Sequence, residues 1–189
     1  MQDTNKGATR DKERTRNALI DAGIQLISER GAGVSLADVA TRAGVSKGAL
    51  THHFASRAAL LDAIVADATR QFWDEVHASV DLSENRAGKL LRGYIRTLTS
   101  DSVFMRQYFS PTFLMVVSGS EQSIQNILHT DAHAWREAFS SDGIDIATSL
   151  ALRLAAEGLA ASVDSPYLSA TELESVREQL LAMAEPVGS

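Results

Sequence analysis

The stretch that decides the fold is Ser35–Phe54, which reads SLADVATRAGVSKGALTHHF. Ser35 is a good helix N-cap, and the charge of Asp38 suits the positive end of a helix dipole. Gly44 tolerates the positive φ that ends a helix, and Ser46 can cap the next one. The stretch therefore predicts two short helices joined by a tight turn.

The second of these helices has two unlike faces. Leu50 and Phe54 recur four residues apart and form an inward face. The outward face carries donors and a small residue, namely Lys47, Gly48, Thr51, His52 and His53. Lysine neutralises phosphates or reaches guanine edges, and hydroxyl and imidazole groups bond phosphates or bases. This pattern predicts a helix that enters the major groove of DNA, and an ordinary hairpin with a polar outer face is the alternative.

Composition narrows the class of protein. The chain has 189 residues, no cysteine and three prolines, and its apolar residues follow a helical period, which favours an all-α fold. Without cysteine there are no disulfides, thiol nucleophiles or thiolate metal sites. No apolar run is long enough for a transmembrane helix, and the polar N-terminus does not resemble a secretory signal. We expect a cytoplasmic protein without membrane contact.

The charge is divided unevenly along the chain. Residues 1–60 hold nine basic and six acidic side chains, a net charge of +3. Residues 61–189 hold nine basic and eighteen acidic ones, a net charge of -9, so that the whole chain has a net charge of -6. A basic head on an acidic body is expected when only the head meets phosphate.

The pattern of apolar residues and helix breakers predicts the organisation of the chain. We expect a flexible arm over residues 1–10, a helix-turn-helix DNA-binding domain over 11–60 and a C-terminal domain over 61–189. A first helix spans 11–30, and a long helix begins after Ser56 and runs to about Val80. Further helices are expected over residues 84–100, capped by Ser83, over two short segments of 102–118 on either side of Pro111, and over 121–140, 144–163 and 169–184.

Residues 12–65 resemble the DNA-binding head of the TetR family of bacterial transcriptional regulators. The resemblance rests on Val34–Ala40, on Ala43–Leu50, on His52-His53-Phe54 and on Arg57–Leu61. It implies an N-terminal three-helix head, joined by a long helix to a helical ligand-binding and dimerisation domain. It also implies a homodimer that binds a palindromic double-stranded DNA operator, usually as a repressor that a small molecule releases.

The resemblance also implies the residues that contact DNA. They are Ser35, Ser46, Lys47, Gly48, Thr51, His52, His53 and Arg57. The family commonly has a tyrosine where this chain has Thr51, and the ring of that tyrosine packs on the phosphate backbone. Threonine keeps a hydroxyl but reaches less far, so His52 takes more of this role.

Aromatic and methionine side chains gather in the segments that the resemblance places around an effector pocket. The candidates for ligand contact are Phe72, Trp73, His77, Phe104, Met105, Tyr108, Phe109, Phe113, His133 and Trp135. Such side chains suit a largely apolar or aromatic effector, with a histidine as polar anchor. The alternative is that they only pack the core. His129 and His133 have the i, i+4 spacing of a zinc pair, but no third ligand is evident, and we expect neither a metal nor a cofactor.

Small and branched apolar residues share one face of the predicted helix 144–163. The candidate dimer contacts are Leu150, Leu154, Gly158 and Leu159 on this helix and Val176 and Leu180 on the last one. The resemblance implies a four-helix bundle made of these two helices from each subunit, and a core helix without a partner is the alternative.

Catalytic motifs are missing from the sequence. There is no Gly-x-Ser-x-Gly elbow and no phosphate-binding glycine loop after a strand, and acidic and basic residues are scattered. We expect no enzyme. A second reading of the function is a DNA-binding regulator without a small-molecule effector, controlled by a protein partner.

Overall fold

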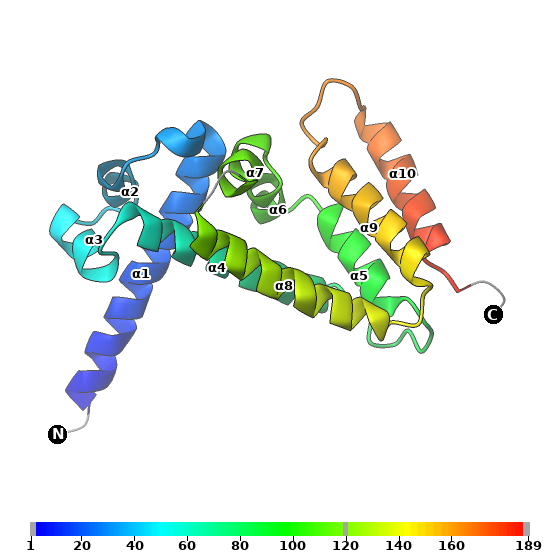
Figure 1. Cartoon of the computed structure of the whole chain (residues 1–189), viewed down its shortest axis with the longest axis horizontal. Coiled ribbons are helices and arrows are strands. Elements are labelled where there is room, and N and C mark those ends of the chain that lie inside the picture. Colours follow the sequence, from blue (N-terminus) through cyan, green and yellow to red (C-terminus); the bar gives the residue numbers. More distant parts are fainter. Residues whose placement is uncertain (1–2, 119–120, 187–189) are drawn as a thin grey trace. The chain divides into compact units, whose positions relative to one another are not determined.

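A computed structural model describes residues 3–118 and 121–186, and every regular element within these ranges is a helix (Figure 1). The elements are α1 (Asp3–Arg30), the 3-10 turn η1 (Gly31–Gly33), α2 (Leu36–Arg42), α3 (Lys47–His53), α4 (Arg57–Ala78), α5 (Lys89–Leu98), α6 (Val103–Tyr108), α7 (Pro111–Ser118), α8 (Gln122–Ser140), α9 (Ile146–Ala160) and α10 (Ala170–Met183). The all-α prediction is confirmed.

Two predicted helix starts were wrong. α1 begins at Asp3 instead of residue 11, so that it includes most of the predicted arm, because no proline or stable cap interrupts the helix there. α5 begins at Lys89 instead of residue 84. Ser83 does not cap it, because the Ser83 amide and hydroxyl both bond the Asp81 carboxylate in a turn, and Gly88 has a φ of 83°.

The chain forms two compact units. The head unit comprises the described residues up to Ala68 together with Pro111–Ile127, and the body unit comprises Thr69–Ser110 together with the described residues from Leu128 onward. Helices α4 and α8 are each divided between the two. These units differ from the predicted domains, since α7 packs on α1 in the head unit, where the Thr112 hydroxyl donates to the Ser28 carbonyl. The predicted functional boundary at residue 60 stays a prediction.

The head unit is built on buried contacts between α1, α2, α3 and α4. Leu19, Ile20 and Leu50 are fully buried. Gly23 lets α1 approach α4 closely, because a Cβ at this position would collide with the side chain of Ile64. Arg42 of α2 makes a bidentate ion pair with Glu29 of α1, with nitrogen–oxygen distances of 2.8 and 3.0 Å. These contacts fix α2 and α3 on a rigid support.

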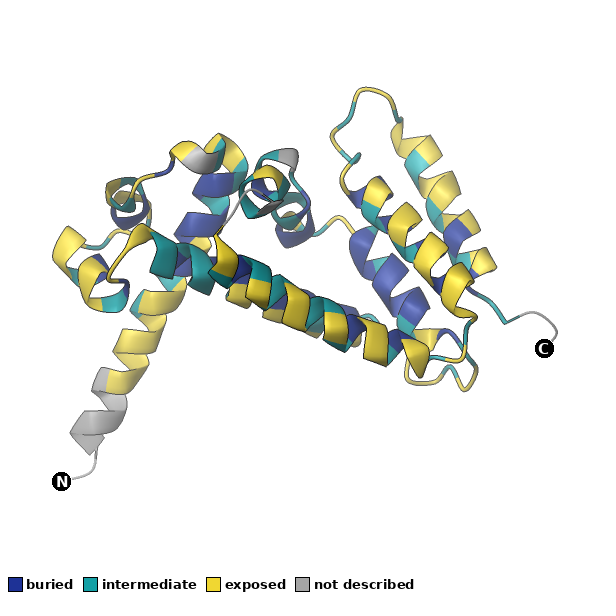
Figure 2. Ribbon diagram, viewed as in Figure 1, coloured by how far each residue is buried: buried dark blue, intermediate teal, exposed yellow. Residues whose placement is uncertain are grey.

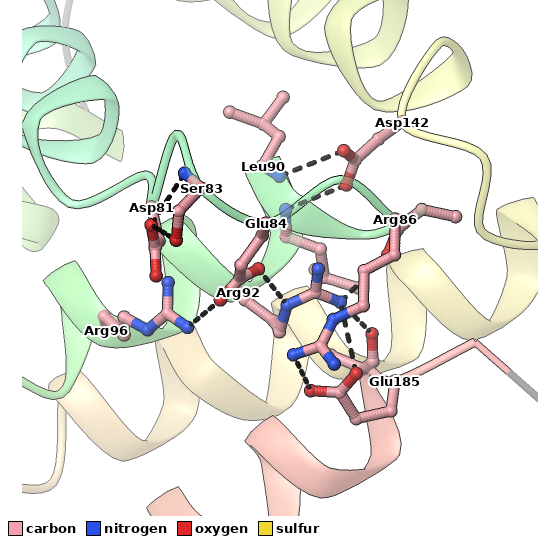
Figure 3. Close-up of polar contacts among 12 residues, drawn as sticks. Asp81, Ser83, Glu84, Arg86, Leu90, Arg92, Arg96, Asp142 and Glu185 are labelled. Carbon is pink, nitrogen blue, oxygen red and sulfur yellow. Dashed lines mark hydrogen bonds and ion pairs between the residues drawn. The ribbon is translucent and has the colours of Figure 1, made fainter. Parts of the chain in front are cut away.

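In the body unit, α5 packs against α9 and α10 (Figure 1). Arg92 of α5 is 1 % exposed and holds the end of α10, because its Nη1 donates to the Ala184 carbonyl at 2.8 Å (Figure 3). Its Nε donates to Glu84 at 2.6 Å, and Arg96 bonds the other oxygen of the same carboxylate at 2.5 Å. Arg86 adds an ion pair to Glu185 at 3.0 Å. This cluster ties the loop before α5 to the C-terminal end of α10.

Candidate functional site

The segment from α2 to α3 has the caps that the sequence predicts. Ser35 and Asp38 form a reciprocal capping box, with the Asp38 amide bonded to the Ser35 hydroxyl at 3.2 Å and the Ser35 amide to the Asp38 carboxylate at 2.9 Å. Gly44 takes a φ of 68° in the turn. The Ser46 hydroxyl accepts a bond from the Ala49 amide at 3.1 Å and caps α3. The predicted two-helix motif is confirmed as local structure.

One face of α3 is anchored and the opposite face is open. Leu50 is fully buried and Phe54, which ends the helix, is 4 % exposed. The polar residues Lys47, Gly48, Thr51 and His52 are exposed, and His53 is half-buried (Figure 2). The buried pair therefore determines which side chains α3 presents to solvent.

Three predicted contact residues already have partners in the head unit. The Ser35 hydroxyl is engaged with Asp38 in the capping box. The Thr51 hydroxyl donates within its own helix, toward the carbonyls of Lys47 and Gly48 at 3.2 and 3.0 Å, so that in this arrangement its proton is not available to a phosphate, which only accepts hydrogen bonds. Arg57 donates its Nε to the Val34 carbonyl at 3.1 Å.

His53 lies in a positively charged environment. Partial burial, and then the charges of His52, Lys12 and Arg16, lower its pKa below the ordinary value. Lys12 and Arg16 belong to α1, which the sequence pattern did not indicate as part of the binding surface. The neutral imidazole still offers one donor and one acceptor for recognition.

In the body unit, most of the predicted effector residues meet in one aromatic cluster. The Phe72 ring lies 5.5 Å from Tyr108, 5.9 Å from Phe109 and 5.4 Å from Trp135. Trp73 stacks on Trp135 with the ring centroids 3.7 Å apart. Phe104 joins through a contact of 5.6 Å with Tyr108, and Met105 is buried in the same unit.

Three predicted effector residues lie outside this cluster or at its margin. Phe113 is buried in the head unit. His133 is 76 % exposed and lies 4.0 Å from Glu137. His77 is also exposed, although its ring stacks on Trp73 at 5.3 Å. His129 is exposed, and no group of three potential metal ligands occurs in the part of the chain that the structure describes.

Sequence reasoning missed several members of the cluster. Tyr94 packs edge-on against Phe72, Trp135 and Phe139, and its hydroxyl donates to Glu157 at 2.6 Å. Its place one turn from Leu91 and Leu98 was the signal that could have found it. Asp131 accepts a bond from the Trp73 indole at 2.7 Å.

Burial changes the acidity of these polar groups. Burial raises the pKa of Asp131, although hydrogen bonds from the indoles of Trp73 and Trp135 act in the opposite direction. Burial also raises the pKa of Tyr108, and the charges of Asp131 and Glu157 raise it further. The aromatic cluster thus contains hydrogen-bonding groups as well as apolar rings.

The body unit also contains a cavity of about 300 Å³ between the end of α5, the end of α9 and the first half of α10. Leu98, Leu159 and Leu173 contribute apolar surface, and Asp101, Glu174 and Arg177 contribute charge. Among the predicted effector residues, none lines this cavity. It is a pocket of ligand size that opens to solvent and is separate from the aromatic residues that the sequence singled out.

An apolar stripe runs along the solvent side of α9. Ile146, Leu150 and Leu154 are 73 %, 48 % and 59 % exposed, and Gly158 continues the four-residue spacing. Val176 on α10 is also exposed. The other two predicted contacts differ, since Leu159 and Leu180 are buried against the helices of the body unit.

Comparison with known proteins identifies both parts of the chain. Residues 19–64 match the family model "Bacterial regulatory proteins, tetR family", and residues 88–185 match the "Tetracyclin repressor-like, C-terminal domain" model. The HTH-type transcriptional regulator BetI of Burkholderia thailandensis is 30 % identical over 166 residues, which cover 83 % of this chain and 82 % of that protein.

Solved structures agree with these matches. A TetR family member from Streptomyces coelicolor A3 is 26 % identical, with a TM-score of 0.63 over 92 % of this chain and 99 % of that one. The multidrug binding protein EbrR, complexed with imidazole, is 25 % identical, with a TM-score of 0.63 over 92 % and 96 % of the two chains. In the described residues no helix has the length and apolar character of a membrane span. The chain belongs to the TetR family of DNA-binding transcriptional regulators and is not an enzyme.

Proposed function

We propose that this regulator is a cytoplasmic repressor that reads a palindromic operator with α3. The observation that carries the proposal is the open polar face of α3, which the buried Leu50 and Phe54 aim away from the head core. Lys47 contacts phosphate or a guanine edge, His52 and His53 bond phosphates or bases, and Gly48 lets the helix backbone approach the duplex. Further DNA contacts at the edge of this face are made by Ser35, Ser46, Thr51 and Arg57.

The proposed active form is a homodimer. A palindrome is read by two heads about 34–36 Å apart, so that the subunits must be joined in a fixed geometry. Support comes from the exposed stripe of Ile146, Leu150, Leu154 and Gly158 on α9, beside Val176 on α10. Burial of these side chains against a second copy would remove their apolar surface from water.

A small effector is proposed to release the operator. EbrR, a relative in fold, is a multidrug binding protein that was solved in complexes with imidazole and with malachite green. The aromatic cluster around Phe72, Tyr108 and Trp135 supplies an apolar surface with polar groups at Asp131 and Tyr94. Helix α4 carries Arg57 at one end and Phe72 and Trp73 near the other, so that its displacement would change the head spacing. A coupling free energy of about 1–3 kcal/mol is enough for such control.

A second candidate is a regulator without a small-molecule effector, controlled by a protein partner. It is favoured by the close packing of the rings, since Trp73 and Trp135 stack at 3.7 Å and leave no room between them. The two candidates differ in whether an aromatic compound changes the affinity for DNA.

Selection of genomic fragments by the purified protein tests the proposed function. We expect enrichment of one palindromic sequence, and release of the protein from it by at least one compound in a panel of small aromatic molecules. Absence of any enriched palindrome would refute operator reading. An enriched palindrome that no compound releases would favour control by a protein partner.

A further inference from the structure

Residues 9–17 of α1 form a largely exposed stretch of helix with a net positive charge. Residues 9–14 and 16–17 are exposed, whereas Leu19, Ile20 and Leu26 are buried, so that α1 extends well beyond the part that packs in the head core (Figure 2). This stretch carries four basic residues, Arg10, Lys12, Arg14 and Arg16, and two acidic ones, Asp11 and Glu13. An exposed helical extension gains little stability from tertiary packing, so its charge pattern points to a partner outside the chain.

Two of these basic residues lie next to the recognition helix. Lys12 and Arg16 are four residues apart and therefore share a face of α1. The Arg16 guanidinium lies 5.5 Å from the centre of the Phe54 ring, and Phe54 directly follows α3. The charges of both residues also reach the half-buried imidazole of His53 on α3. This face of α1 thus adjoins the C-terminal end of α3.

The side chains of Lys12 and Arg16 lie without an acidic partner among the side chains that the structure describes. Among the described side chains from residue 9 onward, no carboxylate forms an ion pair with Lys12 or Arg16, whereas Arg14 pairs with Asp11 at 3.2 Å. Partial burial and the charge of His52 lower the pKa of His53, and the charges of Lys12 and Arg16 lower it further. A row of phosphates would supply the missing negative charge.

We propose that Lys12 and Arg16 of α1 form a second DNA-backbone surface, which grips phosphates beside the groove that α3 enters. The proposal rests on the proposed use of α3, and it adds contacts that position the head without reading sequence. Arg16 is oriented by the Phe54 ring, which also anchors α3, so that the two surfaces are linked through one residue.

Salt dependence of DNA binding tests this surface. The double variant Lys12→Gln/Arg16→Gln is compared with Arg10→Gln/Arg14→Gln, which removes the same charge at the same spacing from the same helix. Residues two apart in a helix are separated by about 200°, so that the control pair lies on nearly the opposite face. Binding to a fluorescent duplex of mixed sequence is measured by anisotropy over a range of KCl concentrations, and unfolding midpoints check that both variants fold.

We expect the plot of log affinity against log salt to become shallower in Lys12→Gln/Arg16→Gln, by about 0.9 for each phosphate that the variant no longer neutralises, and to keep the wild-type slope in the control. Preference for an operator over the mixed duplex should not change, because phosphate contacts carry no sequence information. Equal slopes for the two double variants, or a wild-type slope for Lys12→Gln/Arg16→Gln, would overturn the proposal. A failure of α3 as the reading helix would instead appear as unchanged operator preference in Lys47→Ala.

Discussion

Gly48 occupies the first turn of α3 in open space. A Cβ at this position would meet only the Ser46 hydroxyl, at the ordinary contact distance of 3.8 Å. Alanine should therefore stabilise the fold slightly, by about 0.5–1 kcal/mol, because glycine loses more backbone freedom in a helix. The same methyl group would stand on the face that approaches DNA.

We therefore expect Gly48→Ala to raise or preserve the unfolding midpoint and to weaken operator binding. Thermal unfolding and anisotropy titration of the same preparation measure the two effects. Full operator affinity in this variant would show that the backbone of α3 does not approach the duplex at Gly48.

At the scale of secondary-structure elements, α5 and α10 are held together by Glu84, which lies in the loop between α4 and α5. Its carboxylate bonds the buried Arg92 and also Arg96, and Arg92 in turn bonds the Ala184 carbonyl at the end of α10 (Figure 3). Removal of one partner from a buried ion pair typically costs about 3–5 kcal/mol, because a charge is left uncompensated. We expect Glu84→Gln to lower the free energy of unfolding on this scale in urea titrations, whereas Glu178→Gln on exposed α10 surface should have little effect.

The pH dependence of this cluster has a definite sign. Burial alone would raise the pKa of Glu84, but the hydrogen bonds and charges of Arg96 and Arg92 outweigh it and hold the pKa below 4.5. The carboxylate therefore stabilises the fold above pH 4.5, and this contribution is lost as the pH falls through the folded-state pKa. Wild type should lose more stability than Glu84→Gln over this acidic range, and parallel curves for the two proteins would contradict the assignment.

The apolar stripe of α9 gives a second prediction at this scale. Leu154 is 59 % exposed in the single chain, and a carboxylate there would be buried without a partner in the proposed dimer. We expect Leu154→Glu to sediment as a monomer and to bind operator DNA more weakly, while Gln122→Glu on exposed α8 surface remains dimeric. A stable Leu154→Glu dimer would remove α9 from the interface.

At the scale of the whole molecule, local sequence signals were enough to predict the helices and turn of the head. Features that depend on contacts between distant residues were not predicted. Ser35, Gly44 and Ser46 act within a few residues of chain, and all three have the predicted roles in the turn and caps. The predicted cap at Ser83 was wrong, because the Asp81 carboxylate holds the amide and hydroxyl of Ser83 in a turn, and Glu84 bonds Arg92 and Arg96, eight and twelve positions away, instead of starting a helix.

In the body unit too, contacts between distant residues could not be predicted from the local sequence. The aromatic residues could be identified from composition, but the partners of Tyr94 and Asp131 lie 63 and 58 positions away along the chain. Phe113 resembled the other aromatic candidates in sequence, yet it belongs to the head unit, since α7 packs on α1. Local patterns do not contain such pairings.

Operator reading by α3 is tested by the variants Lys47→Ala and His53→Ala. Affinity for the selected palindrome and for a scrambled duplex is measured at one fixed salt concentration, with Lys89→Ala in the body as the matched removal of a lysine. We predict that both α3 variants bind the palindrome more weakly, by about 1–3 kcal/mol where the side chain bonds a base, while Lys89→Ala binds like wild type. Wild-type affinity for the palindrome in both Lys47→Ala and His53→Ala would show that α3 does not read the operator.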